Sequence, residues 1–213
     1  MKSIAEIRRE YMLQEFLESD AAESPIDQFT KWWSDAERSK IEEVNAMVLA
    51  TSSKAGSPSA RVVLLKGFSS AGFIFFTNYN SHKAKELLEN PYACLVFFWK
   101  ELERQIRIEG SVEKIPEGAS DAYFNSRPEN SKIGAWSSPQ SDVIPGRELI
   151  ENNVSAYLLQ FKNSMIPRPT GWGGYIVRPA LLEFWQGRPS RLHDRIQYSL
   201  QEDKSWKIER LAP

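Results

Sequence analysis

Short runs in which apolar residues alternate with polar ones, or follow one another directly, recur along most of the chain. Turn-forming residues separate these runs, as in the segments 55–58 and 69–72. A period of two residues is typical of a strand with one buried face, so the runs predict strands rather than helices. The predicted strands cover residues 46–51, 59–67, 72–78, 93–100, 105–115, 174–185, 188–200 and 205–211.

Helical periodicity is found in fewer segments. Pro25 is well placed in the first turn of a helix, and Phe29 and Trp32 follow it on one helical stripe. Ser81 is a candidate N-cap for a second helix, which Pro91 would end. The predicted helices cover residues 25–42, 82–89, 116–126, 131–136 and 146–161.

The first part of the chain differs from the rest. Residues 1–25 are charged and poor in aromatic residues, so we expect a flexible N-terminal arm, partly helical around residues 4–17, that orders only on contact. Residues 26–213 are expected to form a single domain. Because strands outnumber helices and most neighbours are close enough for antiparallel pairing, the pattern predicts a mainly β fold, a small β-barrel with peripheral helices.

Composition limits the class of protein. A chain of 213 residues, 41% of them hydrophobic, is long enough to fold without a disulfide or metal. With 27 basic and 28 acidic residues the net charge is −1, which argues against a nucleic-acid-binding domain. No apolar run approaches the ~20 residues of a membrane span. The charged start and the single cysteine, Cys94, favour a cytoplasmic protein without a structural zinc site.

A basic cradle is the first candidate site. Arg61 and Lys66 lie on a predicted strand, and His82, Lys83 and Lys85 lie near the start of a predicted helix. Cations are unfavourable in the first turn of a helix unless an anion binds there, since the backbone N–H groups and the helix dipole already make that end positive. The alternative interpretation is a solvated basic surface.

The segment 123–132 is the second candidate. Tyr123, Arg127, Ser131 and Lys132 place several hydrogen-bond donors near a helix start, and a phosphate monoester needs several charge-assisted hydrogen bonds at once. Ordinary capping of a helix end is the alternative explanation.

The third candidate lies on the strand predicted near the C-terminus. Alternation places Arg191, His193 and Arg195 on one face, where three cations would repel one another without an anionic or planar ligand. An exposed strand face is the alternative. The segments 140–141 and 183–187 add polar groups and aromatic residues, but neither is specific alone.

Motifs of several enzyme classes are missing, including the dinucleotide-binding glycine pattern, the phosphate loop and the nucleophile elbow. Other segments are present, in the order Arg61-Val-Val-Leu-Leu-Lys66, Phe76-Thr-Asn, Ser81-His-Lys-Ala84, Glu103-Arg-Gln105, Tyr123-Phe-Asn-Ser-Arg-Pro128, Ser131-Lys-Ile-Gly-Ala-Trp136, Gln140-Ser141, Glu183-Phe-Trp-Gln-Gly187, Arg191-Leu-His-Asp-Arg195 and Trp206-Lys-Ile-Glu-Arg-Leu-Ala-Pro213. In sequence and order they resemble the pyridoxamine 5′-phosphate oxidase family, from the arm segment Arg8-Arg-Glu-Tyr11 to the last residue.

The resemblance implies a fold and an activity. The fold is an FMN-binding split β-barrel of antiparallel Greek-key type that forms a homodimer. The activity is FMN-dependent oxidation of pyridoxamine 5′-phosphate or pyridoxine 5′-phosphate by O₂ to pyridoxal 5′-phosphate, with release of H₂O₂, as in vitamin B6 biosynthesis and salvage. No metal is required.

The resemblance also implies the site residues. The FMN contacts are Arg61, Val62, Val63, Leu64, Leu65, Lys66, Phe76, Thr77, His82, Lys83, Gln105, Gln140, Ser141, Trp185 and Arg195. The substrate contacts are Arg8, Tyr11, Lys66, Tyr123, Arg127, Ser131, Arg191, Leu192 and His193. Among these, Arg191 and His193 are the expected catalytic residues, which hold the pyridine ring over the flavin, and Arg8 and Tyr11 help to close the pocket from the arm.

The chain departs from the family pattern at two places. His82 stands where the family usually has arginine, and an imidazole offers fewer hydrogen-bond donors than a guanidinium. Glu43 is followed by Val44 instead of the usual proline. Two other functions are alternatives: another flavin split-barrel oxidase acting on a different ring, such as a phenazine precursor, and a non-catalytic flavin- or pyridoxal-phosphate-binding protein.

Overall fold

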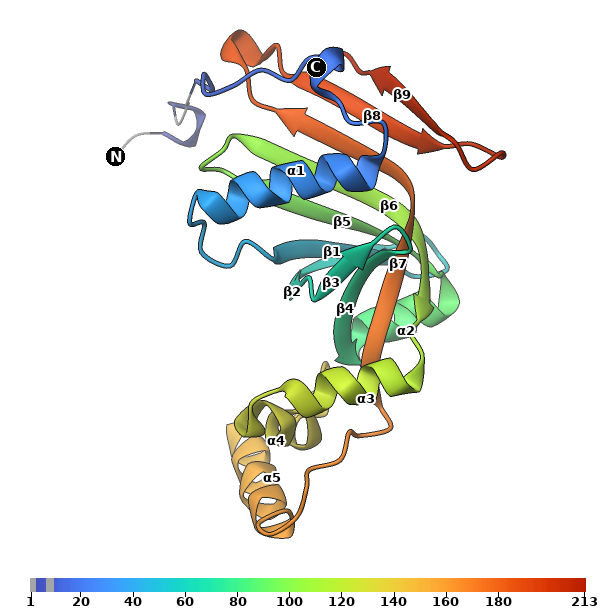
Figure 1. Ribbon diagram of the computed structural model, residues 1–213. Helices are drawn as coiled ribbons and strands as arrows, with labels where there is room; N and C mark the ends of the chain where they lie inside the picture. The colour runs from blue at the N-terminus through green and yellow to red at the C-terminus, as the bar shows by residue number, and fades with distance from the viewer. Residues whose placement is uncertain (1–2, 7–9) are drawn as a thin grey trace.

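A computed structural model of the chain describes residues 3–6 and 10–213 (Figure 1). Nine strands in the described residues form one sheet, in which every hydrogen-bonded neighbour is antiparallel. Along the sheet the order is β2-β1-β5-β6-β7-β4-β3, with β8 paired to β7 and β9 to β8. The strands are β1 (Ala46–Ser52), β2 (Pro58–Leu64), β3 (Gly67–Ser69), β4 (Gly72–Asn78), β5 (Tyr92–Trp99), β6 (Arg104–Lys114), β7 (Trp172–Gln186), β8 (Asp194–Leu200) and β9 (Trp206–Arg210).

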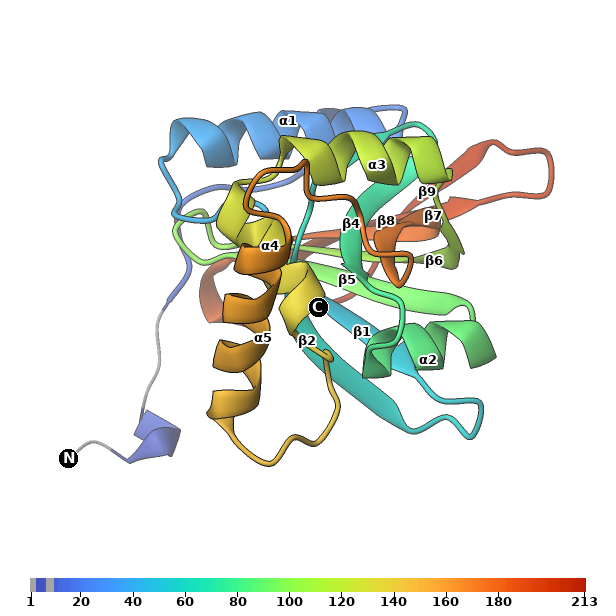
Figure 2. The same cartoon turned by 90° about the horizontal axis from the view of Figure 1, so that it is seen from below.

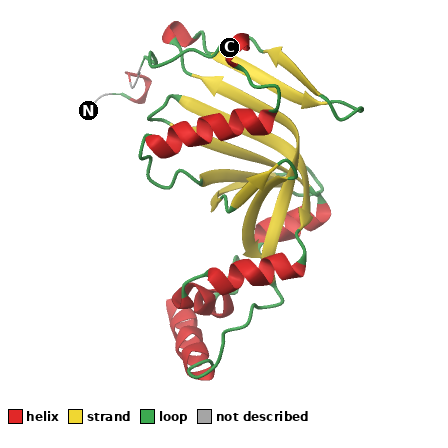
Figure 3. Cartoon of the chain, in the orientation of Figure 1, coloured by secondary structure: helices red, strands yellow, loops and turns green. Residues whose placement is uncertain are grey.

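The helices surround the sheet. In Figure 1, α3, α4 and α5 form a group at one end of the sheet, away from β8 and β9, and Figure 2 shows this group from below. Figure 3 shows α1 crossing one face of the strands. None of the described helices combines the length and apolar character needed to cross a bilayer. The helices are α1 (Pro25–Arg38), α2 (His82–Glu89), α3 (Glu117–Ser126), α4 (Glu129–Ser137) and α5 (Arg147–Gln160), with short 3₁₀ turns η1 (Ile4–Glu6), η2 (Glu18–Asp20) and η3 (Pro189–Arg191).

Helix α1 packs on the sheet through one apolar side. The Ser24 side chain accepts hydrogen bonds from two backbone N–H groups of the first turn, which confirms the predicted start. Phe29 is fully buried, with its ring 4.9 Å from that of Phe73, and Trp32 lies 5.3 Å from Phe184. Each such side chain contributes about 1.5–3 kcal/mol through burial, so this contact fixes α1 on the sheet.

Two predicted boundaries differ from the structure for backbone reasons. The first helix ends at Arg38 rather than at residue 42, because Lys40 adopts a left-handed φ angle of 53°. The predicted strand 59–67 is divided, because the Leu65 N–H bonds back toward β1, at the carbonyl of residue 45, whereas the Lys66 N–H bonds to a carbonyl of β4. The chain therefore changes partner strand at this point.

Strand β7, at 15 residues, extends along the sheet from the group of helices toward β8. It pairs with β6, and the register shifts between Glu109 and Gly110. A Cβ atom at Gly110 would lie 1.9 Å from the carbonyl oxygen of Arg178, so glycine is required for this close approach. Trp172 and Trp185 lie near opposite ends of β7, and each lines a cavity.

From Tyr11 onward the arm lies against the body. The predicted helix around residues 4–17 is wrong for most of its length: within the described residues it is limited to η1. The N–H groups of Met12 and Leu13, which a helix would use, instead donate to the Glu103 carboxylate, at 2.8 and 3.1 Å. Phe16 is buried 5.1 Å from Trp32. These contacts hold the arm in an extended path.

Candidate active site

The larger cavity, of about 850 Å³, lies among β2, β4, α2, α3 and α4 and gathers residues from several of the predicted groups. From the predicted cofactor set it is lined by Arg61, Val62, Val63, Leu64, Lys66, Phe76, Thr77, His82, Lys83, Gln140 and Ser141. From the predicted substrate set it is lined by Lys66, Tyr123, Arg127 and Ser131. Leu65 is buried in the core instead, and Lys85 lies on the surface near Asp142.

Lys83 is the most deeply buried cation of the larger cavity. Its Nζ donates to Thr77 Oγ1 at 3.1 Å, Ser81 Oγ at 3.1 Å and Gln140 Oε1 at 3.0 Å. All three partners are neutral, and in the described part of the chain no carboxylate pairs with this ammonium. Burial, together with the charge of Arg61, lowers the pKa of Lys83 to about 8. Such an ammonium is poised to bind an anion.

Ser81 lies at the start of α2 but does not cap it as predicted. Its hydroxyl donates to the Asn78 carbonyl at 2.7 Å and accepts the hydrogen bond from Lys83, and its side chain makes no capping bond. The serine thus orients Lys83 rather than satisfying the N–H groups of the first turn.

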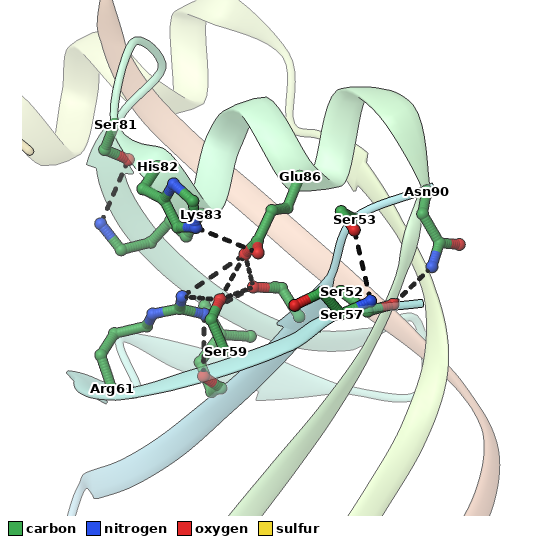
Figure 4. Close-up of polar contacts among 12 residues, drawn as sticks. Ser52, Ser53, Ser57, Ser59, Arg61, Ser81, His82, Lys83, Glu86 and Asn90 are labelled. Atoms are coloured by element: carbon green, nitrogen blue, oxygen red, sulfur yellow. Dashed lines mark hydrogen bonds and ion pairs between the residues drawn. The ribbon is translucent and has the colours of Figure 1, made fainter. Parts of the chain in front are cut away.

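A carboxylate that the sequence analysis did not include lies beneath α2 (Figure 4). Glu86 is 5% exposed and accepts hydrogen bonds from Thr51 and Ser59, while Arg61 Nη2 lies 3.4 Å and His82 Nε2 3.1 Å from its two oxygens. The only signal in the sequence is its place four residues after His82, on the same face of the helix. Its strand partners come from a distant part of the chain, so the sequence does not reveal them.

Arg127 is a second basic residue of the same cavity that could bind an anion. Its guanidinium lies 4.6 Å from the centroid of the Trp172 ring, and Trp172 in turn stacks on Phe76 at 5.4 Å. Tyr123 stacks on Phe76 at 3.9 Å. Within the described residues Arg127 Nη1 is buried without a hydrogen-bond partner, and burial lowers the pKa of this guanidinium. An unpaired buried donor is costly, so this geometry favours a bound acceptor.

The smaller cavity, of about 300 Å³, gathers a different set of residues on β6, β7 and β8. The predicted residues that line it are Gln105, Trp185, His193 and Arg195. Arg107 and Glu183 also line it, although neither is among the predicted ligand contacts. Glu183 accepts from Arg107 Nη2 and Arg195 Nε, each at 2.7 Å. Although burial alone raises the pKa of Glu183, the hydrogen bonds from Arg195 and Arg107 lower it overall.

His193 packs on the aromatic wall of the smaller cavity. Its ring lies 4.5 Å from that of Trp185, and Nδ1 accepts the backbone N–H of Arg188 at 3.1 Å, which assigns the proton of the neutral ring to Nε2. Burial and the charge of Arg191 lower the pKa of His193. Tyr11 of the arm lies 6.0 Å from this ring. Arg8 lies outside the described residues.

The predicted strand 188–200 is wrong in its first half, because β8 begins only at Asp194. Pro189 cannot donate to a strand ladder and instead starts η3, in which Ser190 and Arg191 take left-handed φ angles of 55° and 63°. Arg191, His193 and Arg195 therefore do not share one strand face. Arg191 and the neighbouring Leu192 are exposed and line neither cavity.

The two cavities share no residue, and an exposed sheet face lies between them. Val62, which lines the larger cavity, pairs with Val48 of β1, and Val48 pairs in turn with Val96 of β5. Phe98, also on β5, pairs with Gln105 of the smaller cavity. Val48, Val62 and Phe98 are 37%, 67% and 54% exposed, so this face is apolar and uncovered in the single chain.

Two family models match the chain. The model for pyridoxamine 5′-phosphate oxidase matches residues 34–161, and the model for the pyridoxine 5′-phosphate oxidase C-terminal dimerisation region matches residues 172–213. A pyridoxine/pyridoxamine 5′-phosphate oxidase of Trichormus variabilis is 52% identical over 212 residues, which cover 100% of this chain and 99% of the relative. One of Cupriavidus pinatubonensis is 53% identical over 213 residues, which cover 100% of both chains.

Two solved structures share the fold of this chain. PhzG from Burkholderia lata 383, in complex with tetrahydrophenazine-1-carboxylic acid, superposes with a TM-score of 0.88 at 30% identity, covering 95% of this chain and 99% of PhzG. A pyridoxamine 5′-phosphate oxidase-related, FMN-binding protein from Nostoc punctiforme superposes with a TM-score of 0.71 at 18% identity, covering 91% of this chain and 100% of that protein. The predicted split-barrel fold is confirmed.

Proposed function

Because the chain belongs to the pyridoxamine 5′-phosphate oxidase family and is an oxidoreductase, we propose that it oxidises pyridoxamine or pyridoxine 5′-phosphate to pyridoxal 5′-phosphate. The cofactor is FMN and the electron acceptor is O₂. Pyridoxine 5′-phosphate and O₂ give pyridoxal 5′-phosphate and H₂O₂, and the amine substrate additionally consumes water and releases ammonia. One observation carries the proposal: a single cavity holds two separate anion-ready cations, Lys83 and Arg127, as a phosphorylated cofactor and a phosphorylated substrate require.

The described residues fit the FMN that the family implies. Lys83 has only neutral partners, so a cofactor phosphate would supply its missing counter-charge, with Arg61 close by. When bound, FMN supplies the redox chemistry by taking two electrons from the substrate and passing them to O₂.

The substrate phosphate is assigned to Arg127, with Tyr123 and Ser131 beside it. Trp172 holds the Arg127 guanidinium by stacking, so the donor Nη1 is oriented before the substrate arrives. The Trp185 ring and the Arg188 N–H hold the His193 ring, so its Nε2–H would be free to donate to the pyridine ring of a bound substrate.

The two cavities are expected to combine across a homodimer. Trp172 of the larger cavity and Trp185 of the smaller one are 13 residues apart on β7, and the two cavities share no lining residue, so within one chain each cavity presents only part of the predicted residue set. The match to a dimerisation region covers Glu183, Trp185 and Arg195. We assign the uncovered sheet face as the surface on which a second copy brings its smaller cavity to the larger one.

Oxygen uptake by the purified protein tests the function. A yellow protein with flavin absorbance that consumes O₂ on addition of pyridoxine 5′-phosphate supports it. The similarity to PhzG makes a phenazine precursor the second candidate, so a reduced phenazine carboxylate is assayed in parallel. Uptake with that compound alone would replace the proposed substrate, and a yellow protein with no uptake would indicate flavin storage.

The affinity for FMN is expected to fall as the pH rises through about 8, which is the lowered pKa of Lys83. Above that pH the empty site has lost its ammonium proton, and binding a phosphate dianion must take a proton up, so affinity drops by up to about tenfold per pH unit. Lys83→Met should bind FMN weakly without this slope, whereas the exposed Lys85→Met control should keep it. Titrating apoprotein with FMN between pH 7 and 9.5 checks this. Identical slopes in wild type and Lys83→Met would contradict it.

Replacement of His193 by alanine is expected to lower kcat roughly a hundredfold while FMN stays bound, since the ring faces the substrate and not the cofactor phosphate. Because the pKa of His193 is lowered, the neutral ring persists in acid, so the wild-type rate should fall only below the ordinary value of 6.5. Steady-state rates from pH 5 to 8 and the flavin-to-protein absorbance ratio measure both effects. Loss of flavin in step with activity would refute this role.

A further inference from the structure

Glu86 is an acidic residue next to the basic residues of the larger cavity, where the cofactor phosphate is proposed to bind. It lies one helical turn after His82 and is almost fully buried beneath α2 (Figure 4). Its oxygens accept hydrogen bonds from the hydroxyls of Thr51 and Ser59, and the side chains of Arg61 and His82 lie within ion-pair distance of them. Burial alone would raise the pKa of Glu86, but the hydrogen bonds from Ser59 and Thr51 and the charges of His82 and Arg61 lower it overall, so the carboxylate is ionised at neutral pH.

Arg61 is held directly by neutral oxygens, two of which belong to the hydroxyls that donate to Glu86. Its Nη1 donates to the Leu49 carbonyl at 3.2 Å and to the Thr51 hydroxyl, and its Nη2 donates to the Ser59 hydroxyl. Glu86 is the more distant partner, at 3.4 Å. The neutral oxygens therefore orient the guanidinium, and the contribution of Glu86 is mainly its charge.

The basic residues around the start of α2 differ in their partners. Arg61 and His82 are paired with Glu86, whereas Lys83 has only neutral partners. An incoming phosphate therefore finds the ammonium free but must share the other two with a carboxylate that also repels it.

We propose that Glu86 is an internal counter-ion that competes with the cofactor phosphate for Arg61 and His82, stabilising the empty site and weakening cofactor binding. The assignment of a cofactor phosphate to this position rests on the proposed function. Glu86 acts through Arg61 and His82, so it is a positioning residue and not a catalytic one.

The test is Glu86→Gln, which keeps an oxygen for the hydroxyls of Thr51 and Ser59 but removes the charge. FMN titrated into the apoprotein, followed by flavin fluorescence, should bind roughly tenfold more tightly, the effect of removing one unit charge whose repulsion of the phosphate is screened by the solvent of an open cavity. Riboflavin, which lacks the phosphate, should bind as it does to wild type. The empty variant should melt at a lower temperature than the empty wild type, and FMN should raise its melting temperature more.

The matched control is Glu89→Gln, on the same helix but exposed and away from the cavity, which should change none of these values. Unchanged or weaker FMN binding by Glu86→Gln would overturn the proposal, because a residue that only supports Arg61 predicts weaker binding. Equal tightening of riboflavin would also overturn it. The readout is equilibrium binding, so a protein that binds FMN but consumes no O₂ would contradict the proposed function and leave this inference intact.

Discussion

Two inactive variants of this chain, Lys83→Met and His193→Ala, should recover activity when they are mixed. Lys83 lines the larger cavity and His193 the smaller one, and the proposed site takes one cavity from each protomer. In a mixed dimer one site carries both substitutions and the other carries neither. Random exchange of protomers should therefore restore about a quarter of the wild-type sites, from a background near zero.

The measurement is O₂ uptake after the two variants are unfolded together and refolded with FMN, or after co-expression. The matched control pairs Lys83→Met with Arg127→Met, both in the larger cavity, because every site of that mixed dimer remains defective. Recovery in the first mixture and none in the second is the expected pattern. Equal activity in the two mixtures would show that each chain builds its own complete site.

Arg127→Met should raise KM for the phosphorylated substrate roughly a hundredfold, since a charge-assisted hydrogen bond contributes about 1.5–3 kcal/mol and the whole guanidinium is removed. FMN should remain bound, because the cofactor phosphate is assigned to Lys83. Arg127→Lys should recover only part of the loss, because lysine cannot stack as a plane on Trp172 or donate as a fork.

Unphosphorylated pyridoxine separates a phosphate contact from a general defect. Wild type should strongly prefer pyridoxine 5′-phosphate, and Arg127→Met should lose most of that preference by weakening only the phosphate ester. Arg147→Met, an exposed position on α5, is the control and should match wild type. A variant that turns over both substrates as wild type does would remove Arg127 from the substrate site.

The sequence predicts local structure best where chemistry and period agree. Strand β4 has the predicted limits, because a short apolar run is bounded by turn formers, and α1 begins at Pro25 as predicted. The prediction for the region after Gly187 is wrong. Alternation at Arg191 and His193 indicates a strand, but Pro189 cannot donate to a strand ladder and begins η3 instead. There the backbone chemistry of one proline outweighs the hydrophobic pattern.

The candidate site could be predicted as a set of residues but not as an arrangement. Motifs indicate Arg61, Lys83 and Arg127, and the structure brings these three together in the larger cavity. The role of Glu86 depends on contacts with β1 and β2, which are distant in the sequence. The placement of Trp185 in a second cavity likewise follows from strand order and not from local pattern.

Strand β7 has a consequence for communication between sites. It carries Trp172 at one cavity and Trp185 at the other, and its pairing with β6 allows no side chain at Gly110. In the proposed dimer each β7 belongs to both catalytic centres, so a shift of this strand along its axis is transmitted to two sites at once. This strand alone could therefore couple the two centres. A substitution at Gly110, which would disturb the pairing of β7 with β6, is expected to weaken that coupling.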